Sequence, residues 1–408
     1  MTTTPETPVN KRERINAVDA LRGFALAGIV LTHVVEQYMA YMPTPEMDAI
    51  MTQGPVDMAV NNFIFWVFRG KFFALFSFLF GISFFLQMDA AAKKGMDFKL
   101  RFLWRLVLLF GIGLVHRFFY AGDILTLYAL LGIVLIPFYH LNNKIVFALA
   151  ALLFLGAGHF IAFSIWGSGP IFVVPGLEKM YENYLSVLTN GSFTDIIRCN
   201  WIRLLDDYNF QIMPFTGRGY LTFAFFLLGM LLGRKRWLEN IVEHLPLIKK
   251  IMYYSLVGTV VMIPVFAFLY SKMENIFVYE TWLSMFAITA YDNFNLFFTL
   301  FLAAGFIVLF EKKKDQSFLS YFAPFGRMAL TNYFLQSVIG AFIFFGWGLG
   351  LLGKMRNIEA FVLAIVILII QMIISNYWLR RFNFGPIEWF WRSLTYFKWQ
   401  PFVRKSNI

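Results

Sequence analysis

Long apolar runs constrain the fold of this chain more than any other feature of its sequence. Several of them reach the length of about 20 residues that a helix needs to cross a bilayer. Of the 408 residues, 59% are hydrophobic and 14% are charged, whereas soluble domains average about 25% charged residues. The sequence therefore predicts an all-α, polytopic integral membrane helix bundle with about ten transmembrane helices. We expect the crossings at residues 17–36, 68–88, 101–120, 122–140, 144–166, 218–233, 250–270, 286–310, 326–348 and 359–379.

The positive charges indicate how these helices are oriented. With the N-terminus inside, the inner segments hold 24 Lys and Arg residues and the outer segments hold 10. Cytoplasmic loops carry an excess of Lys and Arg, so we expect both termini in the cytoplasm. The net charge of +11 then fits an anionic membrane surface, and no nucleic-acid partner is expected.

The polar segments suggest how the chain is divided. A cap at the outer interface is expected where apolar and charged positions alternate at helical spacing. The single Cys199 excludes an intrachain disulfide and a Cys-rich metal site, and no metal is expected. The expected parts are 1–13, a disordered cytoplasmic tail; 14–166, an N-terminal transmembrane bundle; 167–217, an extracytoplasmic amphipathic cap; 218–398, a C-terminal transmembrane region; and 399–408, a cytoplasmic tail.

The first expected helix carries Asp19, Arg22 and His33 within an apolar stretch. Ionisable groups in a membrane helix usually face a protein interior or a water-filled cavity. Arg22 and His33 are eleven residues apart, which places them on one helix face, separated by roughly 16 Å. Arg22 is expected to contact an anionic ligand or to pair with Asp19. His33 is expected to act as a general base or to be a hydrogen-bonded interfacial residue.

The third expected helix repeats this arrangement. Arg101 and Arg105 lie at its inner end and His116 lies near its outer end, eleven residues after Arg105. Asp123 follows in a tight outer turn. We therefore expect His33, His116 and Asp123 to converge at the outer face. Asp123 either orients a histidine or caps the turn, and His116 is either a second polar group of the site or a packing residue.

Two C-terminal segments carry further polar residues. Asn332 and Gln336 are four residues apart and share a helix face, where they either join helices or contact a substrate. In the basic and aromatic segment after the last crossing, Glu388 and Arg392 form an i,i+4 pair if the segment is helical. Arg392 either follows the positive-inside rule or contacts phosphate.

Several of these motifs resemble known families. Arg22, ten intervening residues and His33 resemble the Arg-x10-His signature of membrane acyltransferases that use acyl-CoA. The chain as a whole resembles the bacterial YeiB-type membrane proteins, which have a C-terminal region of unknown function. They belong to the same superfamily as lysosomal heparan-α-glucosaminide N-acetyltransferase. The motifs that carry the resemblance are INAVDALRGFALAGIVLTHV, GIGLVHRFF, GDILTLYAL, FGRMALTNYFLQSV and RFNFGPIEWFWRSLTY.

The resemblance implies a membrane acyltransferase in the bacterial cytoplasmic (plasma) membrane. Acyl-CoA, with acetyl-CoA as the expected form, would bind from the cytoplasm. Its acyl group would pass to a hydroxyl or amine on the opposite side, on a glycan or an envelope metabolite. Arg22 matches the arginine of the motif and His33 its catalytic histidine, and Arg101 and Arg105 correspond to a pair of arginines in the family's third helix. We therefore expect Arg22, Arg101 and Arg105, with Arg392 as a further arginine, to contact CoA. His33, with His116 and Asp123, is the expected catalytic group.

Other functions remain open at this point. A small-solute transporter or exporter would use Asp19, Arg22 and His33 along its pathway. A sensor or scaffold would bind a lipid or CoA without turnover. Besides the lipid bilayer, a homodimer partner is compatible with the sequence.

Overall fold

The computed structural model describes residues 16–40, 43–167, 177–202, 218–273, 281–313 and 318–404. Within these ranges the chain is helical, and the only strand-like pairing is an isolated bridge between Phe382 and Val403. The elements are α1 (Asn16–Val35), α2 (Pro45–Met51), α3 (Pro55–Phe63), the π-helical turn η1 (Ile64–Phe68), α4 (Lys71–Ala92), α5 (Lys99–Arg117), α6 (Leu125–Leu135), η2 (Ile136–His140), α7 (Asn143–Phe154), α8 (Ala157–Trp166), α9 (Leu177–Asn190), α10 (Phe193–Ile202), α12 (Arg218–Lys235), α13 (Ile241–Tyr270), α14 (Trp282–Lys313), η3 (Phe318–Tyr321), α15 (Phe322–Arg327), α16 (Ala329–Phe344), α17 (Asn357–Arg381) and α18 (Pro386–Tyr396).

Five helices in the described residues are long and apolar enough to cross a membrane. They are α1, the continuous run Pro55–Ala92, α13, α14 and α17, and the bent pair of α7 and α8 would make a sixth span. All of these coincide with expected crossings. The other four expected crossings are also helical, but their helices α5, α6, α12 and α16 are shorter or more charged. An all-helical membrane protein is thus confirmed, whereas ten crossings and cytoplasmic termini stay predictions.

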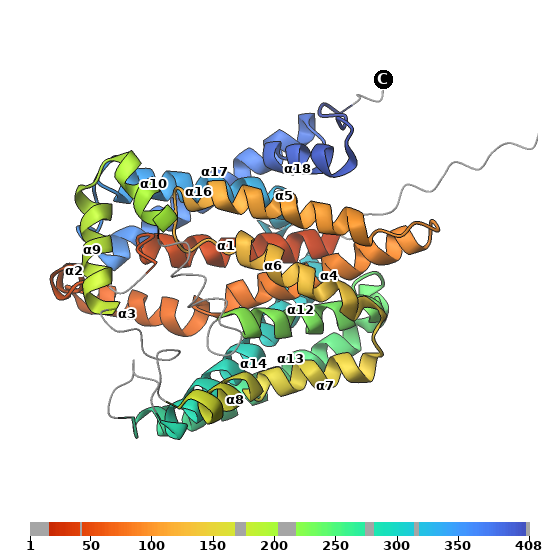
Figure 1. The fold of residues 1–408 in the computed structure, drawn as a ribbon, viewed down its shortest axis with the longest axis horizontal. Coiled ribbons are helices and arrows are strands. Elements are labelled where there is room, and N and C mark those ends of the chain that lie inside the picture. The colour runs from red at the N-terminus through yellow and green to blue at the C-terminus, as the bar shows by residue number, and fades with distance from the viewer. Residues whose placement is uncertain are drawn as a thin grey trace, which may run out of the picture.

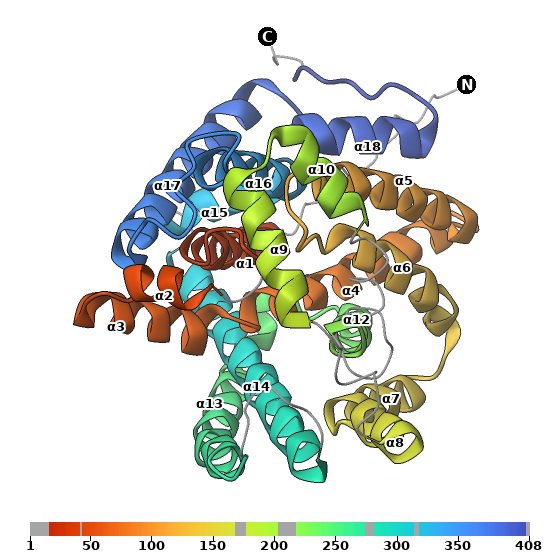
Figure 2. The ribbon, with the colours of Figure 1, turned by 60° about the vertical axis from the view of Figure 1, so that its left-hand side comes forward.

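Helix α1 lies in the middle of the bundle (Figure 2). It packs against α4, α15, α16 and α17, so the N-terminal helix is surrounded by helices from both halves of the chain. The crossing with α15 is unusually close: a Cβ at Gly326 would lie 1.9 Å from the carbonyl oxygen of Asp19, and one at Gly23 would lie 2.1 Å from that of Phe322. Small residues allow this approach, which holds Asp19 and Arg22 against the C-terminal half.

A second group of helices lies beside this central bundle. α12 packs along α4, and α13 pairs with α14 (Figures 1 and 2). α7 and α8 are bent by 61° at a short break and pack against α14. These helices form the side of the molecule that faces away from α16 and α18 (Figure 2).

The two ends of the bundle are covered differently. Of the expected cap, residues 168–176 and 203–217 lie outside the described residues, and the rest forms α9 and α10 at one end (Figure 1). Asn200 of α10 joins this end to α5, because its amide donates to the carbonyl of Phe118 at 3.3 Å. α18 lies at the opposite end, and residues 399–404 fold back on it. The predicted disorder of 1–13 also lies outside the described residues.

Candidate functional site

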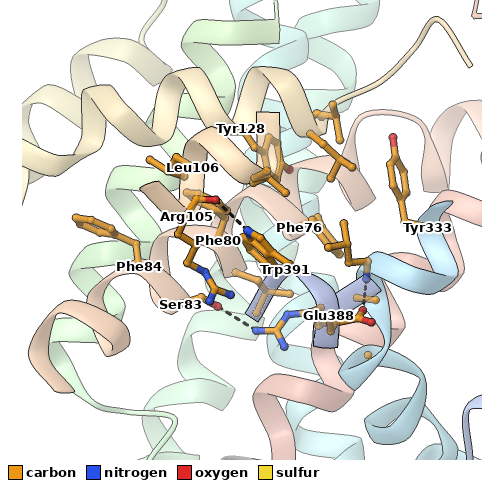
Figure 3. A pocket seen from close by; sticks show the side chains of 18 of the residues that line it. Phe76, Phe80, Ser83, Phe84, Arg105, Leu106, Tyr128, Tyr333, Glu388 and Trp391 are labelled. Carbon is orange, nitrogen blue, oxygen red and sulfur yellow. Dashed lines mark hydrogen bonds between the residues drawn. The ribbon is translucent and has the colours of Figure 1, made fainter. Parts of the chain in front are cut away.

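A cavity of about 270 Å³ lies among α1, α4, α5, α6, α16 and α18. Most of its walls are apolar, and Figure 3 shows Phe76, Phe80, Tyr128 and Trp391 around it. Its lining includes four arginines, Arg22, Arg105, Arg327 and Arg392. Residues from both halves of the sequence therefore build one pocket.

Arg22 lies at this cavity while also making the local pair expected from the sequence. Its guanidinium is 2.9 Å from Asp19 Oδ1, and it donates to Ser83 Oγ on α4 at 3.0 Å (Figure 3 shows Ser83). Asp19 is buried, whereas Arg22 is half-buried. The two contacts hold the guanidinium at the cavity wall. Pairing of Arg22 with Asp19 is therefore compatible with contact between Arg22 and a ligand in the cavity.

Arg105 is held by an aromatic side chain from the far end of the chain. Its guanidinium carbon lies 3.7 Å from the ring centroid of Trp391, and Trp391 Nε1 donates to the carbonyl of Arg105 at 2.9 Å (Figure 3). A cation over an indole face is attracted by the ring quadrupole. Arg101 has a different position: it is exposed, its guanidinium lies over Tyr396 and it does not line the cavity. The arginine pair expected to act together is thus divided.

Glu388 and Arg392 both line the cavity but do not form the expected ion pair. The Glu388 carboxylate instead accepts from the backbone amides of Leu330 at 2.7 Å and Thr331 at 3.0 Å, and from the Thr331 hydroxyl (Figure 3). An anion is stabilised at a helix N-terminus, where amide groups lack intrahelical partners. Because the start of α16 satisfies Glu388, the i,i+4 prediction is wrong, and Arg392 lies exposed over Phe384 and Tyr396.

The electrostatics of Glu388 reflect its burial. Loss of water raises the pKa of this carboxyl above its ordinary value of 4.5, and the hydrogen bonds from Thr331 act in the opposite direction. Glu388 thus places a titratable group between the arginine-bearing cavity and the start of α16.

Tyr333 connects the cavity to a second set of polar residues. It lines the cavity, and its ring stacks on His116 with centroids 4.6 Å apart. The fully buried His116 has its Nδ1 at 2.8 Å from Asp123 Oδ1 and its Nε2 at 2.8 Å from Ser337 Oγ. The expected contact between His116 and Asp123 is therefore present.

Asp123 contacts both His116 and the start of α6. Besides contacting His116, its carboxylate accepts from the amide of Thr126 at 2.9 Å and from that of Leu125 at 3.2 Å. These bonds cap the start of α6. The structure thus shows the cap, and a role of Asp123 in orienting His116 stays a prediction.

His33 and His116 share two aromatic neighbours. Its ring is 4.9 Å from Tyr120 and 6.5 Å from Tyr333, and both tyrosines also neighbour His116. His33, His116 and Asp123 therefore lie near one another, although neither histidine lines the cavity itself. Their expected position at the outer face stays a prediction. We call His33, His116, Asp123 and Tyr333 the histidine cluster.

Asn332 and Gln336 differ more than their shared helix face suggests. Asn332 donates to Ser375 Oγ on α17 at 2.8 Å and to the carbonyl of Phe325 at 3.2 Å, so it joins α15, α16 and α17. Gln336 is 1% exposed, and neither polar atom of its side chain has a hydrogen-bond partner among the described residues. Asn332 thus has the structural role, and Gln336 is the one of the pair with unused hydrogen-bonding capacity.

Four residues of this region were missed as site residues by sequence reasoning: Arg327, Tyr333, Ser337 and Trp391. Arg327, Tyr333 and Ser337 are in or next to the helix that carries Asn332, and Trp391 is next to Arg392. Their proximity to the chosen residues was the only available signal. It was too weak, because the partners of Tyr333, Ser337 and Trp391 come from α5, more than 200 residues away.

These features define the protein as an all-helical membrane protein with an arginine-bearing cavity that leads to a buried histidine cluster. The chain is 30% identical to the uncharacterized protein YxaH of Bacillus subtilis, over 98% of this chain and 99% of that protein. It is 24% identical to the uncharacterized protein YeiB of Escherichia coli, over 97% and 100%. Residues 232–398 match the family described as a protein of unknown function, DUF418. The chain belongs to this family of YxaH- and YeiB-like proteins, which confirms the resemblance to YeiB-type proteins.

Proposed function

We propose that this protein is a membrane acyltransferase of the acyl-CoA-dependent superfamily, located in the bacterial cytoplasmic membrane. It takes an acyl group, with acetyl as the preferred form, from cytoplasmic acyl-CoA. The acceptor is a hydroxyl or amine on the opposite side of the membrane, on a glycan or an envelope metabolite. No metal takes part in this proposal.

One observation carries the proposal: a single, mostly apolar cavity is lined by four arginines and by Tyr333, which stacks on His116 of the histidine cluster. Arg392 is exposed, Arg22 and Arg105 are half-buried, and Tyr333 lines the cavity while stacking on His116. Acyl-CoA combines the matching chemistry, with phosphates, a thin pantetheine arm and a reactive thioester. This match supports a donor bound in the cavity, with its phosphates at the arginines and its thioester toward Tyr333.

The arginines supply the expected recognition of phosphate. Guanidinium groups bind phosphate oxygens with two parallel hydrogen bonds and keep their charge. Arg105 and Arg392 are both held by aromatic rings, which leaves their N–H groups available to an anion. Arg101 faces away from this cavity, so we assign the phosphate contacts to Arg22, Arg105 and Arg392.

The histidine cluster supplies the expected base. A neutral imidazole removes the proton of the acceptor hydroxyl or amine while its oxygen or nitrogen attacks the thioester carbonyl, and CoA leaves as the thiolate. Asp123, 2.8 Å from His116 Nδ1, positions that ring beside Tyr333. We assign the base to His33, with His116 and Asp123 as the supporting pair.

Transfer of label from acyl-CoA tests this function. Inside-out membrane vesicles containing the protein receive acetyl-CoA labelled in the acetyl group, and label in acid-stable, CoA-free material is counted. We expect incorporation with the wild type and with His140→Gln, a histidine outside the site, and its loss with His33→Gln. Equal incorporation in all three proteins, or none with folded wild type, contradicts the proposal.

A small-solute transporter is the second candidate, supported by the break between α7 and α8. Transporters often bind their substrate where membrane helices are discontinuous, and this pair is bent by 61°. Flux of a solute into proteoliposomes in the absence of acyl-CoA would favour this function over acyl transfer. Binding of acyl-CoA without turnover would instead indicate a sensor.

A further inference from the structure

A second buried polar cluster lies outside the arginine-bearing cavity. It consists of His159 from α8, Tyr220 from α12 and Asp292 from α14, which are 1%, 5% and 8% exposed. None of the three lines the cavity or contacts the histidine cluster. The three helices belong to the group beside the central bundle (Figure 2). A carboxyl group and an imidazole buried together in a membrane protein mark a functional site by default.

The three side chains are hydrogen-bonded to one another. Tyr220 Oη lies 2.6 Å from His159 Nε2 and donates to Asp292 Oδ2, and His159 Nε2 is 3.4 Å from the same carboxylate oxygen. Because Tyr220 has one proton to donate, the geometry fits an Nε2–H of His159 donating to the tyrosine oxygen. The tyrosine then connects the imidazole to the carboxylate.

The helix that carries His159 is interrupted just before it. Gly156 has φ of 78°, a left-handed conformation that favours glycine, and a Cβ there would lie 2.2 Å from Thr289 Oγ1. Asn293 Nδ2 donates to the carbonyl of Phe154 at 2.8 Å and so satisfies an end of α7. Interrupted backbone at membrane depth is tolerated where it is buried in protein or lines a polar site. The break thus lets Thr289 of α14 lie against Gly156, shortly before His159 in the sequence.

Two polar atoms at this break have no hydrogen-bond partner in the part of the chain that the structure describes. They are His159 Nδ1 and Thr289 Oγ1, and both are buried. Leaving a buried acceptor unsatisfied is costly. The free nitrogen of His159 is the far end of the chain of hydrogen bonds that begins at Asp292.

Few other charges face the cluster from the packed helices. Lys71 of α4 is fully buried, with its ammonium 5.5 Å from the ring of Tyr291 and hydrogen-bonded to the carbonyls of Arg69 and Phe65. On α13, Tyr270 reaches Tyr291 only through Phe266. Within the described residues, His159 is the sole basic group within ion-pair distance of Asp292. The partners of the Asp292 carboxylate are therefore the Tyr220 hydroxyl and the His159 ring rather than a Lys or Arg side chain of the described residues.

We propose that His159, Tyr220 and Asp292 form a proton-exchange site that holds one proton in the membrane part of the protein. A proton arrives at His159 Nδ1. The Nε2 proton then passes to the tyrosine oxygen, and the hydroxyl proton of Tyr220 passes to Asp292 Oδ2. The result is a neutral imidazole protonated at Nδ1, an intact phenol and a neutral carboxylic acid. Reversal of the same steps releases the proton.

The test follows both ends of the relay during one acid titration of purified protein. Infrared spectroscopy reports the protonated carboxyl group, and nitrogen-15 NMR of labelled histidine reports which ring nitrogen carries the proton. His159→Gln identifies the signals of His159 among the five histidines. Asp292→Asn removes the carboxyl with little change of shape, and Asp89→Asn, at a carboxylate that already pairs with Lys93 and Arg236, is the matched control.

In the wild type and in Asp89→Asn we expect one transition in which Asp292 gains its proton while His159 changes from Nε2–H to Nδ1–H. Asp292→Asn should lose that carboxyl band. Tyr220→Phe should separate the two transitions by about tenfold or more in proton affinity, because the connecting hydroxyl is gone. The proposal is overturned if the band persists in Asp292→Asn, if Nδ1 stays unprotonated throughout, or if folded Tyr220→Phe keeps both transitions together. The comparison of the wild type with Tyr220→Phe tests the proposal even if Asp292→Asn does not fold.

Discussion

The guanidinium of Arg105 lies 3.7 Å from the ring centroid of Trp391, and the indole N–H of Trp391 donates to the carbonyl of the same arginine. The two residues are 286 positions apart in the sequence, Arg105 on α5 and Trp391 on α18. This contact closes one side of the cavity with a helix from the C-terminal region. Arg105 is thereby aimed at the cavity, while Arg101, one turn earlier, points elsewhere.

Trp391→Leu should weaken acyl-CoA binding by about tenfold. A cation–π contact contributes roughly 0.5–2 kcal/mol, and 1.4 kcal/mol corresponds to a factor of about ten in affinity. Trp391→Phe keeps a ring face and should lose less. Calorimetric titration measures the acyl-CoA affinity of both variants. An equal loss of affinity in the two would show that the ring face at position 391 does not position Arg105.

Asp123→Asn should lower the rate of acyl transfer by about 100-fold or more without changing acyl-CoA affinity. Asparagine keeps an acceptor for the start of α6 but removes the carboxylate that positions His116, which supports the base His33, and a positioned base contributes about 10²–10⁴ in rate. Initial rates over a range of acyl-CoA concentrations separate the two effects. A variant with normal turnover would remove His116 and Asp123 from the mechanism.

Glu388 should make stability fall as the pH rises. Burial raises its pKa above 4.5, so the folded protein keeps a proton at pH values where the unfolded chain has released it. The free energy of unfolding then decreases from pH 4.5 up to the raised pKa and is constant beyond it. Glu388→Gln lacks this titration, so we expect the wild type to lose thermal stability relative to the variant over that window. A relative gain would mean that the hydrogen bonds at α16 outweigh burial and lower the pKa.

Gly326→Ala should destabilise the protein, whereas Gly305→Ala should be nearly neutral. A methyl group at Gly326 meets the backbone of α1 at 1.9 Å, but at Gly305 its nearest contact is Met252 Sδ at 3.8 Å. Overpacking of a close contact costs about 1–3 kcal/mol. Thermal unfolding of the purified variants in detergent compares them directly, and equal midpoints would contradict the close crossing of α1 and α15.

Local relationships were the part of the site that sequence reasoning predicted well. Asp19 and Arg22 are three residues apart on one helix, and His116 and Asp123 are joined by a short turn. In both cases the chain itself brings the groups together. The apolar runs likewise predicted the helices, because an apolar segment of membrane length has few alternatives to a helix.

Long-range partners were beyond that reasoning. Glu388 was assigned to Arg392 by helical spacing, but the unsatisfied amides at the start of α16, 57 residues earlier, hold it instead. His159 had no nameable partner because Tyr220 and Asp292 come from two other helices, 61 and 133 residues away. Spacing along one helix shows which side chains share a face, but not which helix packs against that face.

Calorimetric titration of acetyl-CoA into purified wild type, Arg105→Gln and Arg101→Gln tests the central claim most directly. The two arginines are one helical turn apart, but only Arg105 lines the cavity. Hydrogen bonds to charged groups contribute about 1.5–3 kcal/mol. We therefore predict saturable binding by the wild type and Arg101→Gln, and binding weaker by about tenfold or more with Arg105→Gln. No binding by folded wild type, or equal affinity of all three proteins, would contradict an acyl-CoA site at this cavity.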